Sequence, residues 1–246
     1  MNAEAIERLS QITKKAHRIV FFGGAGVSTE SGIPDFRSAD GLFHQKLHRT
    51  LSPEEMVSRT FYERYPEDFF DFYREHLVYP EAEPNDCHKA LAKLEQMGKL
   101  KAVVTQNIDG LHQKAGSKVV YELHGSVLRN YCTRCHKFYG VDAILETSGV
   151  PTCECGGVIK PDVVLYEESL DDTVINKAVN AIAKADMLII GGTSLIVYPA
   201  AGLIQYYRGR KLVLINKSVT QADSYAQLVI HEDIASVMKE ATDALA

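Results

Sequence analysis

The chain has 246 residues, of which 46% are hydrophobic and 24% are charged, proportions that are ordinary for a globular protein. Its 27 basic and 32 acidic residues give a net charge of −5, which disfavours a specific nucleic-acid binder because such proteins cluster Lys and Arg against phosphate. No run reaches the ~18 apolar residues of a membrane helix, and no secretory signal is visible. We therefore expect a cytoplasmic protein that does not bind membranes.

Helical and strand patterns alternate along much of the chain. Helical spacing of apolar residues predicts helices over residues 4–16, 85–97, 171–184 and 234–245. Short apolar segments without alternation predict buried strands over residues 18–22, 101–105, 187–190 and 211–215. This order favours an α/β fold with an open parallel sheet.

Two segments interrupt the alternation. Residues 38–81 are aromatic and charged with a mostly helical pattern, and residues 126–159 hold four of the five cysteines. We interpret both segments as insertions into the α/β domain.

A glycine-rich turn follows the first predicted strand. Gly24, Ala25 and Gly26 would let the backbone turn sharply and approach a pyrophosphate, whose charge is met by N–H groups at a helix N-terminus. The usual dinucleotide pattern has a third glycine where this chain has Thr29. The alternative is a tight strand–helix turn that binds no ligand.

The loop beyond this turn carries an unusual set of side chains. Asp35, Phe36 and Arg37 are consecutive, and Arg37 suits a phosphate because its guanidinium forms bidentate hydrogen bonds. An exposed loop of this composition favours a binding role. The alternative is a surface salt bridge with Phe36 as the anchor of the loop.

Polar side chains follow the second strand, where an open α/β sheet binds its ligands. Gln106 and Asn107 offer donors and acceptors, and Asp109 can hold a ribose hydroxyl or a cationic ring edge. A turn with an Asp-Gly signal is the alternative. Further along, His124 precedes a glycine and is a candidate general base, although a lone histidine is more often structural.

Two further strand ends carry similar residues. Gly192, Thr193 and Ser194 follow the third strand, and Asn216 ends the fourth. Together with the earlier strand ends they would complete a crevice around a nucleotide. A close-packed turn is again the alternative for the glycines.

The four clustered cysteines form two pairs. Two residues separate Cys132 from Cys135, one separates Cys153 from Cys155, and 17 residues lie between the pairs. Such spacing is typical of a four-thiolate Zn²⁺ site, which is closed and therefore structural. A redox pair and an accidental cluster are the alternatives. Cys87 stands apart on a helix face, and we interpret it as a small buried hydrophobe.

Taken together, these motifs resemble the sirtuin family of NAD-dependent protein deacylases. The resemblance runs in the expected order from Gly24 to Asn216. It implies a large Rossmann-like domain of residues 1–37, 82–125 and 160–246. It also implies a small lobe made of a helical insertion, residues 38–81, and a zinc ribbon, residues 126–159.

The resemblance further implies an NAD site in the cleft between the lobes. Its cofactor-binding residues would be Gly24, Ala25, Gly26, Thr29, Asp35, Phe36, Arg37, Gln106, Asn107, Ile108, Asp109, Gly192, Thr193, Ser194, Asn216, Asp233 and Ile234. The catalytic residues would be His124, Asn107 and Asp109, with His124 as the general base. An acetyl-lysine protein or peptide would pair with Val163, Val164, Leu165 and Tyr166.

In the implied reaction, the acyl-lysine oxygen attacks the ribose carbon that bears nicotinamide, and nicotinamide leaves. His124 then removes a proton from a ribose hydroxyl, which attacks the resulting imidate. Water completes the transfer and releases the lysine, so the expected products are nicotinamide, deacetylated lysine and O-acetyl-ADP-ribose.

The chain departs from the family pattern in three places. The second cysteine pair is one residue closer than usual. Many members carry Phe-Gly-Glu where this chain has Tyr166-Glu-Glu168, so we expect an altered loop conformation. Members that remove acidic acyl groups carry a Tyr and an Arg three residues apart, whereas here Tyr73 is followed by His76. Without the bidentate Arg, we predict a preference for acetyl over succinyl groups.

Two other functions are each consistent with some of these motifs. The first is an NAD-dependent oxidoreductase, which Thr29 and the lack of an acidic residue in the usual place after the second strand disfavour. The second is a zinc-ribbon binding module without enzymatic activity, which would leave the polar strand ends unexplained.

Overall fold

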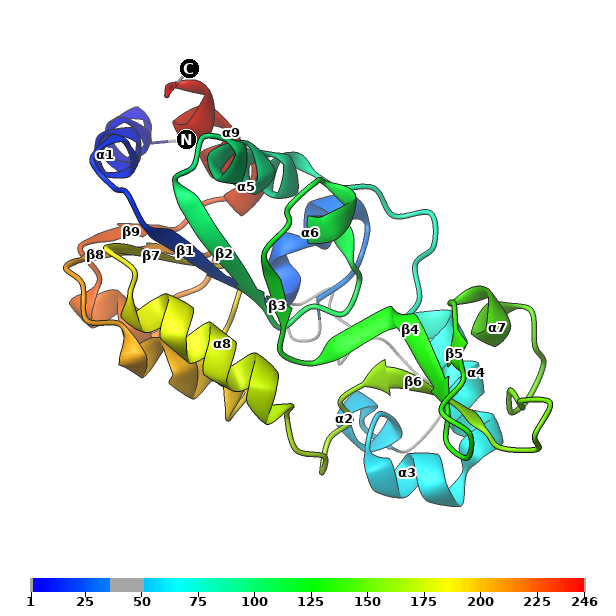
Figure 1. The fold of residues 1–246 in the computed structure, drawn as a ribbon. Coiled ribbons are helices and arrows are strands. Elements are labelled where there is room, and N and C mark those ends of the chain that lie inside the picture. Colours follow the sequence, from blue (N-terminus) through cyan, green and yellow to red (C-terminus); the bar gives the residue numbers. More distant parts are fainter. Residues whose placement is uncertain (1, 36–50, 246) are drawn as a thin grey trace.

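A six-stranded parallel sheet forms the centre of the large domain (Figure 1). The computed structural model describes residues 2–35 and 51–245. Across the sheet the strand order is β3-β2-β1-β7-β8-β9, and every neighbouring pair is parallel. The strands are β1 (Ile19–Gly23), β2 (Leu100–Thr105), β3 (Val120–Glu122), β7 (Met187–Gly191), β8 (Lys211–Ile215) and β9 (Leu228–Ile230). The four strands predicted from the sequence are the four central ones.

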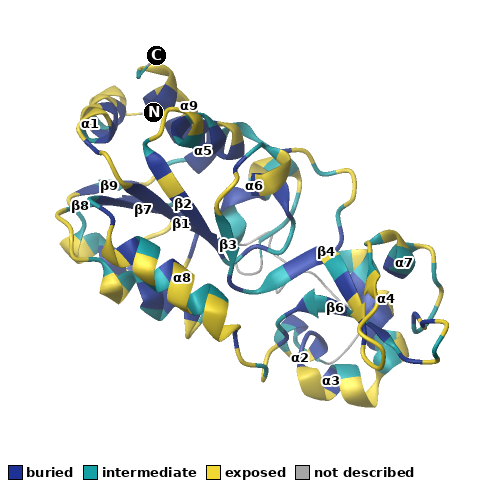
Figure 2. Ribbon diagram, viewed as in Figure 1, coloured by how far each residue is buried: buried dark blue, intermediate teal, exposed yellow. Residues whose placement is uncertain are grey.

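Alternate residues of the central strands enter two apolar cores on opposite faces of the sheet. In β1, Ile19 and Phe21 belong to one core, whereas Val20 and Phe22 belong to the other. All residues of β1 and β7 are buried, and both strands are dark blue in Figure 2. Burial on both faces is the reason that these segments show no alternation in the sequence.

Helices cover both faces of the sheet (Figure 1). One face carries α1 (Ala3–Lys14), α5 (Asp86–Gln96) and α9 (Ile234–Asp243), and the other carries α8 (Asp172–Ala183) and the 3-10 helix η4 (Ala200–Tyr206). The segments predicted as helices form α1, α5, α8 and α9. No helix within residues 2–35 and 51–245 has the length and apolar character needed to cross a membrane.

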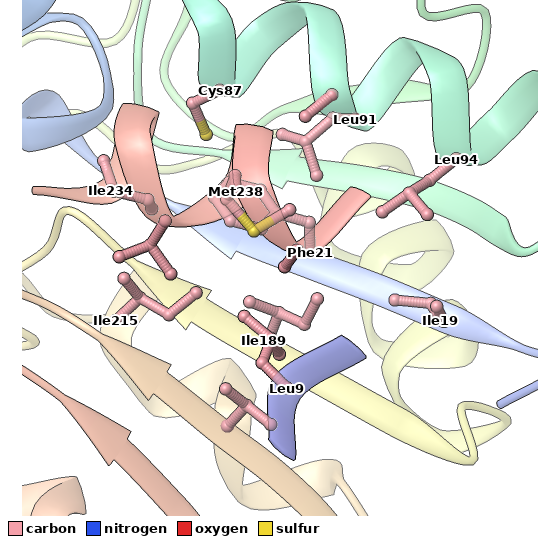
Figure 3. Packing of buried hydrophobic residues seen from close by; sticks show 14 of the residues in the cluster. Leu9, Ile19, Phe21, Cys87, Leu91, Leu94, Ile189, Ile215, Ile234 and Met238 are labelled. Atoms are coloured by element: carbon pink, nitrogen blue, oxygen red, sulfur yellow. The ribbon is translucent and has the colours of Figure 1, made fainter. Parts of the chain in front are cut away.

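The first core is aliphatic and draws on three helices (Figure 3). Leu9 of α1, Leu91 of α5 and Met238 of α9 pack against the sheet side chains Phe21 and Ile189. Cys87 lies fully buried in the same core, which confirms its interpretation as a small hydrophobe.

Within residues 51–245, the small lobe contains a three-stranded antiparallel sheet and four short helices. The sheet order is β5-β4-β6, with β4 (Gly125–Cys132), β5 (Phe138–Tyr139) and β6 (Ile159–Val163). The helices are α2 (Pro53–Met56), α3 (Arg59–Arg64), α4 (Pro66–His76) and α7 (Asp142–Leu145). Figure 1 shows this lobe beside the carboxyl ends of the large sheet.

One apolar core joins both insertions of the small lobe. Phe69, Phe70 and Tyr73 of α4 lie in the same cluster as Ile144 of α7 and Ile159 of β6. The rings of Phe69 and Phe70 meet edge to face, with centroids 5.3 Å apart. The predicted fold class, a Rossmann-like sheet with a small lobe, is confirmed.

The strand order of the large sheet reverses direction between β1 and β7. From β1 the chain proceeds to β2 and β3 on one side, and later to β7, β8 and β9 on the other. Loops leave the carboxyl ends of β1 and β7 in opposite directions at such a switch point, which opens a crevice there. The polar residues predicted from the sequence follow the carboxyl ends of β1 and β7 and of their neighbours β2 and β8.

Candidate functional site

Two glycine turns meet at the switch point. The Gly26 N–H donates to the Gly192 carbonyl at 2.9 Å, and a Cβ added at Gly26 would lie 2.9 Å from the Gly192 Cα. Gly192 has φ +57°, and a Cβ there would lie 2.5 Å from the Val27 nitrogen. Close approach of the turns after β1 and β7 accounts for these glycines, and their contact with a cofactor stays a prediction.

Ser28 joins the first turn to the polar residues after β2. Its Oγ donates to Asp109 Oδ2 at 2.7 Å and accepts from Asn107 Nδ2 at 3.0 Å. The Leu111 N–H donates to the other Asp109 oxygen at 2.9 Å. Burial raises the pKa of Asp109, and these hydrogen bonds oppose that shift. Asn107 and Asp109 therefore share Ser28 as a hydrogen-bond partner, and their catalytic role stays a prediction.

Sequence reasoning missed Ser28 as a site residue. Its hydroxyl is buried, with 1% of the residue exposed, and it lies between the two other polar side chains. The position of Ser28 in the Gly24–Thr29 turn could have indicated a role in the site. Its hydrogen-bond partners, Asn107 and Asp109, lie 79 and 81 residues away in the sequence, so the contact itself could not be predicted. Asn85 was missed for the same reason, since its amide donates to the Val27 carbonyl at 2.7 Å and to Ser31 Oγ at 3.0 Å.

His124 is half-buried and tied to the same cluster. Its Nδ1 lies 2.9 Å from the Gln106 carbonyl. Because a carbonyl oxygen can only accept, Nδ1 carries the proton and the neutral ring presents Nε2 as its basic atom. Burial lowers the pKa of His124, and the hydrogen bond to Gln106 partly offsets that effect. The ring is thus neutral and able to accept a proton near pH 7.

The main chain of His124 also joins the predicted substrate segment. The Val164 N–H donates to the His124 carbonyl at 3.0 Å, directly after β6 ends at Val163. Gly125 has φ +76°, and a Cβ there would lie only 1.9 Å from the Asp162 carbonyl oxygen. Only glycine lets β4 and β6 approach this closely beside the histidine.

The other two residues predicted to pair with a peptide substrate follow β6. Leu165 is buried, whereas Tyr166 is 38% exposed. The Tyr166 N–H donates to the Val57 carbonyl at 3.1 Å, which attaches this segment to the helical insertion.

The strand ends of β2 and β7 are linked by side chains. Gln106 Nε2 donates to Thr193 Oγ1 at 3.0 Å, and the Ile108 carbonyl accepts the Val127 N–H at 2.9 Å. Ser194 is exposed beside them. The structure therefore brings the residues after β2 together with Thr193, as predicted.

The predicted residues of the adenosine side lie after β8 and β9. The Asn216 amide donates to the Ser218 carbonyl at 2.7 Å. Asp233 caps α9 by accepting the Ser236 N–H at 3.0 Å, and its other oxygen lies 3.4 Å from Lys217 Nζ. The Ile234 side chain belongs to the aliphatic core, so any contact of this residue with a cofactor would fall to its main chain.

The first loop is described only as far as Asp35. Ala25 and Asp35 are partly exposed, and Thr29 Oγ1 donates to the Gly26 carbonyl at 3.1 Å. Phe36 and Arg37 lie outside the described residues.

The four cysteines of the small lobe converge. Their sulfurs all lie within 4.8 Å of one another, with Cys132 Sγ 3.4 Å from Cys155 Sγ and Cys135 Sγ 3.6 Å from Cys153 Sγ. Sulfurs at ~2.3 Å from a tetrahedral zinc are roughly 3.8 Å apart, so these distances fit Zn²⁺. The short spacing between Cys153 and Cys155 does not prevent this arrangement.

The fold and these two clusters define a Rossmann-like protein with a zinc-ribbon lobe and a polar cluster at its switch point, where an open α/β sheet has its binding crevice. The model of the Sir2 family matches residues 24–199. The chain is 67% identical to the NAD-dependent protein deacetylase of Clostridium perfringens over 242 residues, which are 98% of this chain and 99% of that relative.

Solved structures agree with this match. A Sir2 structure with a deacetylated p53 peptide and 3′-O-acetyl ADP-ribose has a TM-score of 0.88 at 38% identity and covers 97% of this chain and 98% of its own. A Sir2 structure with p53 peptide and NAD+ has a TM-score of 0.85 at 39% identity and covers 97% of this chain and 98% of its own. The chain belongs to the Sir2 family and is a sirtuin, which confirms the resemblance drawn from its motifs.

Proposed function

We propose that this sirtuin is an NAD-dependent protein-lysine deacetylase that releases nicotinamide, deacetylated lysine and O-acetyl-ADP-ribose. The observation that carries the proposal is the double attachment of His124. Its ring is bonded to Gln106 of the polar crevice, and its main chain is bonded to Val164 of the substrate segment. This double attachment supports His124 as the residue beside which a nucleotide and an acylated lysine would meet.

Residues of the crevice hold the cosubstrate in this proposal. When bound, NAD supplies a ribose that gives up nicotinamide and accepts the acetyl group. Ser28, Asn107 and Asp109 direct hydroxyl, amide and carboxylate groups into one cluster, which suits hydrogen bonding to a ribose. The turns after β1 and β7 meet at Gly26 and Gly192, at the switch point where an open α/β sheet would bind a pyrophosphate.

His124 acts as the general base. Its Nδ1–H is held by Gln106, so Nε2 accepts the proton of a ribose hydroxyl. Because burial lowers the pKa of His124, the ring stays in its neutral form through the physiological range.

The acetylated protein or peptide pairs with the segment from Val163 to Tyr166. Strand β6 is an edge strand of the small sheet among the described residues, and an edge strand can accept an extended peptide by main-chain hydrogen bonds. We place the enzyme in the cytoplasm, where thiols such as those of the cysteine cluster stay reduced.

Acetyl groups are preferred over succinyl groups. Tyr73 is fully buried in α4, and the pair of Tyr73 with His76 lacks an arginine at the second position. The neighbouring Arg74 donates to the carbonyls of Ile144 and Gly149, so its guanidinium is already engaged. A carboxylate on the acyl group would lack its bidentate partner.

The substitution His124→Tyr tests the proposal. We expect NAD binding within about twofold of the wild type and deacetylation lowered by about 10²- to 10⁴-fold, because only the proton acceptor is lost. Calorimetric titration of NAD and mass spectrometry of an acetylated peptide measure the two effects. Turnover retained by the variant would remove His124 from its role.

A further inference from the structure

Glu167 adopts a backbone conformation that its side chain disfavours. Its φ is +76°, and among the described residues only His136 and Leu195 are other non-glycine residues with positive φ. This left-handed region places the Cβ of an L-residue close to the following carbonyl, so it is normally left to glycine. Glu167 stands where the Phe-Gly-Glu pattern has its glycine. The loop therefore keeps a glycine-like conformation without a glycine, and something must hold it there.

Thr60 of α3 provides that restraint. The Thr60 N–H donates to Glu167 Oε2 at 2.9 Å, and its hydroxyl donates to the same oxygen at 2.7 Å. Both bonds end on one carboxylate oxygen and span 107 residues of sequence. Hydrogen bonds to a charged acceptor are about twice as strong as neutral ones, so this pair can hold a strained residue.

The main chain beside Glu167 is attached to the same segment. The Tyr166 N–H donates to the Val57 carbonyl at 3.1 Å, and the Tyr166 carbonyl accepts the Arg59 N–H at 3.0 Å. Ser58 and Tyr166 form an isolated parallel bridge. The helical insertion thus holds the end of the substrate segment by hydrogen bonds to the main chain of Tyr166 and to the side chain of Glu167.

The opposite end of the segment is attached to the catalytic histidine. The Val164 N–H donates to the His124 carbonyl at 3.0 Å. Between these two attachments the loop closes on itself, since the Leu165 N–H donates to Glu168 Oε2 at 2.9 Å and the Leu165 carbonyl accepts the Glu168 N–H at 3.0 Å. The direction of the main chain from Val164 to Tyr166 therefore depends on how Glu167 is held.

We infer that Glu167 is a positioning residue for the protein substrate, which acts through Thr60 to fix the edge on which the acetylated peptide pairs. The inference rests on the proposed deacetylase function and extends it to a residue that contacts neither NAD nor the reacting atoms. The carboxylate supplies two restraints that a glycine would lack, so the loop is preorganised before the peptide arrives. Preorganisation lowers the cost of ordering on binding and appears in the affinity for peptide.

Three substitutions at one position separate the hydrogen bonds from the charge and from the backbone strain. Glu167→Ala removes both bonds and keeps the strain, so we expect the peptide Kd and KM to rise about five- to tenfold. Glu167→Gly removes the bonds but allows positive φ, so a smaller rise of about threefold is expected. Glu167→Gln keeps an oxygen that can accept hydrogen bonds from both Thr60 donors, so its peptide Kd and KM should stay within about twofold of the wild-type values.

The readouts are the anisotropy of a labelled acetylated peptide and steady-state kinetics with peptide and NAD varied separately. The KM for NAD and the kcat should stay within about twofold in all three variants, because the crevice is untouched. Glu63→Ala is the matched control, since Glu63 is an exposed acid of α3 whose ion pair among the described residues is with Arg59, at 2.8 Å, and not with the loop. Its peptide KM should equal that of the wild type.

A double substitution tests the route through Thr60. Thr60→Val removes the hydroxyl donor, and the Thr60→Val/Glu167→Ala protein should bind peptide no more weakly than Glu167→Ala alone. An unchanged peptide Kd in both Glu167→Ala and Glu167→Gly would overturn the inference, as would a Gln variant as weak as the Ala variant. Glu167→Gly relieves the strain, so it reports on the inference even where Glu167→Ala unfolds. Failure of the wild type to release nicotinamide would instead reject the proposed function itself.

Discussion

The large domain and the small lobe hold their functional residues in different ways. In the large domain, polar residues follow central strands that are buried on both faces, so the sheet itself fixes Gln106 and Thr193. In the small lobe, short strands and helices share one apolar core that includes aromatic residues of α3 and α4, and four cysteines converge beside it. The large domain can support its site by packing alone, whereas the lobe depends on a metal and on contacts between two distant insertions.

Loss of a metal ligand should give the largest effect and divide the two regions most clearly. We expect Cys153→Ser to abolish zinc binding and to lower deacetylation more than 100-fold, because an apparent ~10–16 kcal/mol of metal binding stabilises such folds. Hydrogen exchange should become fast in β4 and β6 while β1 and β7 stay protected. Equal loss of protection in both sheets would contradict the separation of the two regions.

Gly125 lies where the two regions meet. Gly125→Ala forces a Cβ to within 1.9 Å of the Asp162 carbonyl at φ +76°, so we expect a loss of roughly 3 kcal/mol or more of unfolding free energy. Gly98→Ala is the control, because Gly98 has φ +71° but no neighbour within 4 Å, and its cost should be about 1 kcal/mol. Urea unfolding followed by circular dichroism measures both, and equal costs would contradict the argument from close approach.

Ser28 tests the large domain alone. Ser28→Ala leaves the Asn107 amide and one Asp109 oxygen without this partner, at ~1–3 kcal/mol, so kcat/KM should fall about 10- to 100-fold. Ser10→Ala is the matched control, since Ser10 is a buried serine of α1 that bonds the Ile6 and Ala241 carbonyls far from the crevice. A similar loss of activity in both variants would assign Ser28 to general stability.

Acid sensitivity gives the most gradual effect in the large domain. His88 and His112 are buried with ring centroids 4.7 Å apart, and burial lowers the pKa of His88 to about 4 and that of His112 well below 6.5. The folded state keeps both rings neutral, whereas the unfolded chain protonates them below pH ~6.5. The contribution of the two neutral histidines to the free energy of unfolding is therefore complete above pH ~6.5. It is lost as the pH falls below ~6.5, at about 1.4 kcal/mol per pH unit for each histidine.

Replacing His112 separates its effect on the pH dependence of stability from the effects of the carboxylates and thiolates that also titrate. Between about pH 6.5 and 4.5, His112→Asn should reduce the slope of unfolding free energy against pH by about 1.4 kcal/mol per pH unit, the contribution of one histidine. Circular dichroism suits the measurement because the chain has no Trp. A variant whose stability falls as steeply as that of the wild type would show that His112 is not held neutral.

Much of the fold was readable from the sequence because its signals are local. The four central strands are apolar on both faces, and the four cysteines are close in sequence and in space. Strands β3 and β9 were missed because each has only three residues and lies at an edge of the sheet, where no continuous apolar run is required.

The site was readable only in part because its geometry depends on remote contacts. Asn107 and Asp109 could be named from their place after a strand. Their shared hydrogen-bond partner, Ser28, lies 79 and 81 residues away in the sequence. The loss of glycine at Glu167 predicted an altered loop, but not that Glu167 would have positive φ and accept two hydrogen bonds from Thr60. A sequence pattern does not reveal such compensation by a distant segment.

The products formed from NAD and an acetylated peptide test the central claim most directly. The purified protein with its metal intact is incubated with both, and the mixture is resolved by liquid chromatography and mass spectrometry. Nicotinamide, O-acetyl-ADP-ribose and deacetylated peptide should appear in equal amounts. Intact NAD with unchanged peptide, or formation of reduced cofactor, would contradict the account.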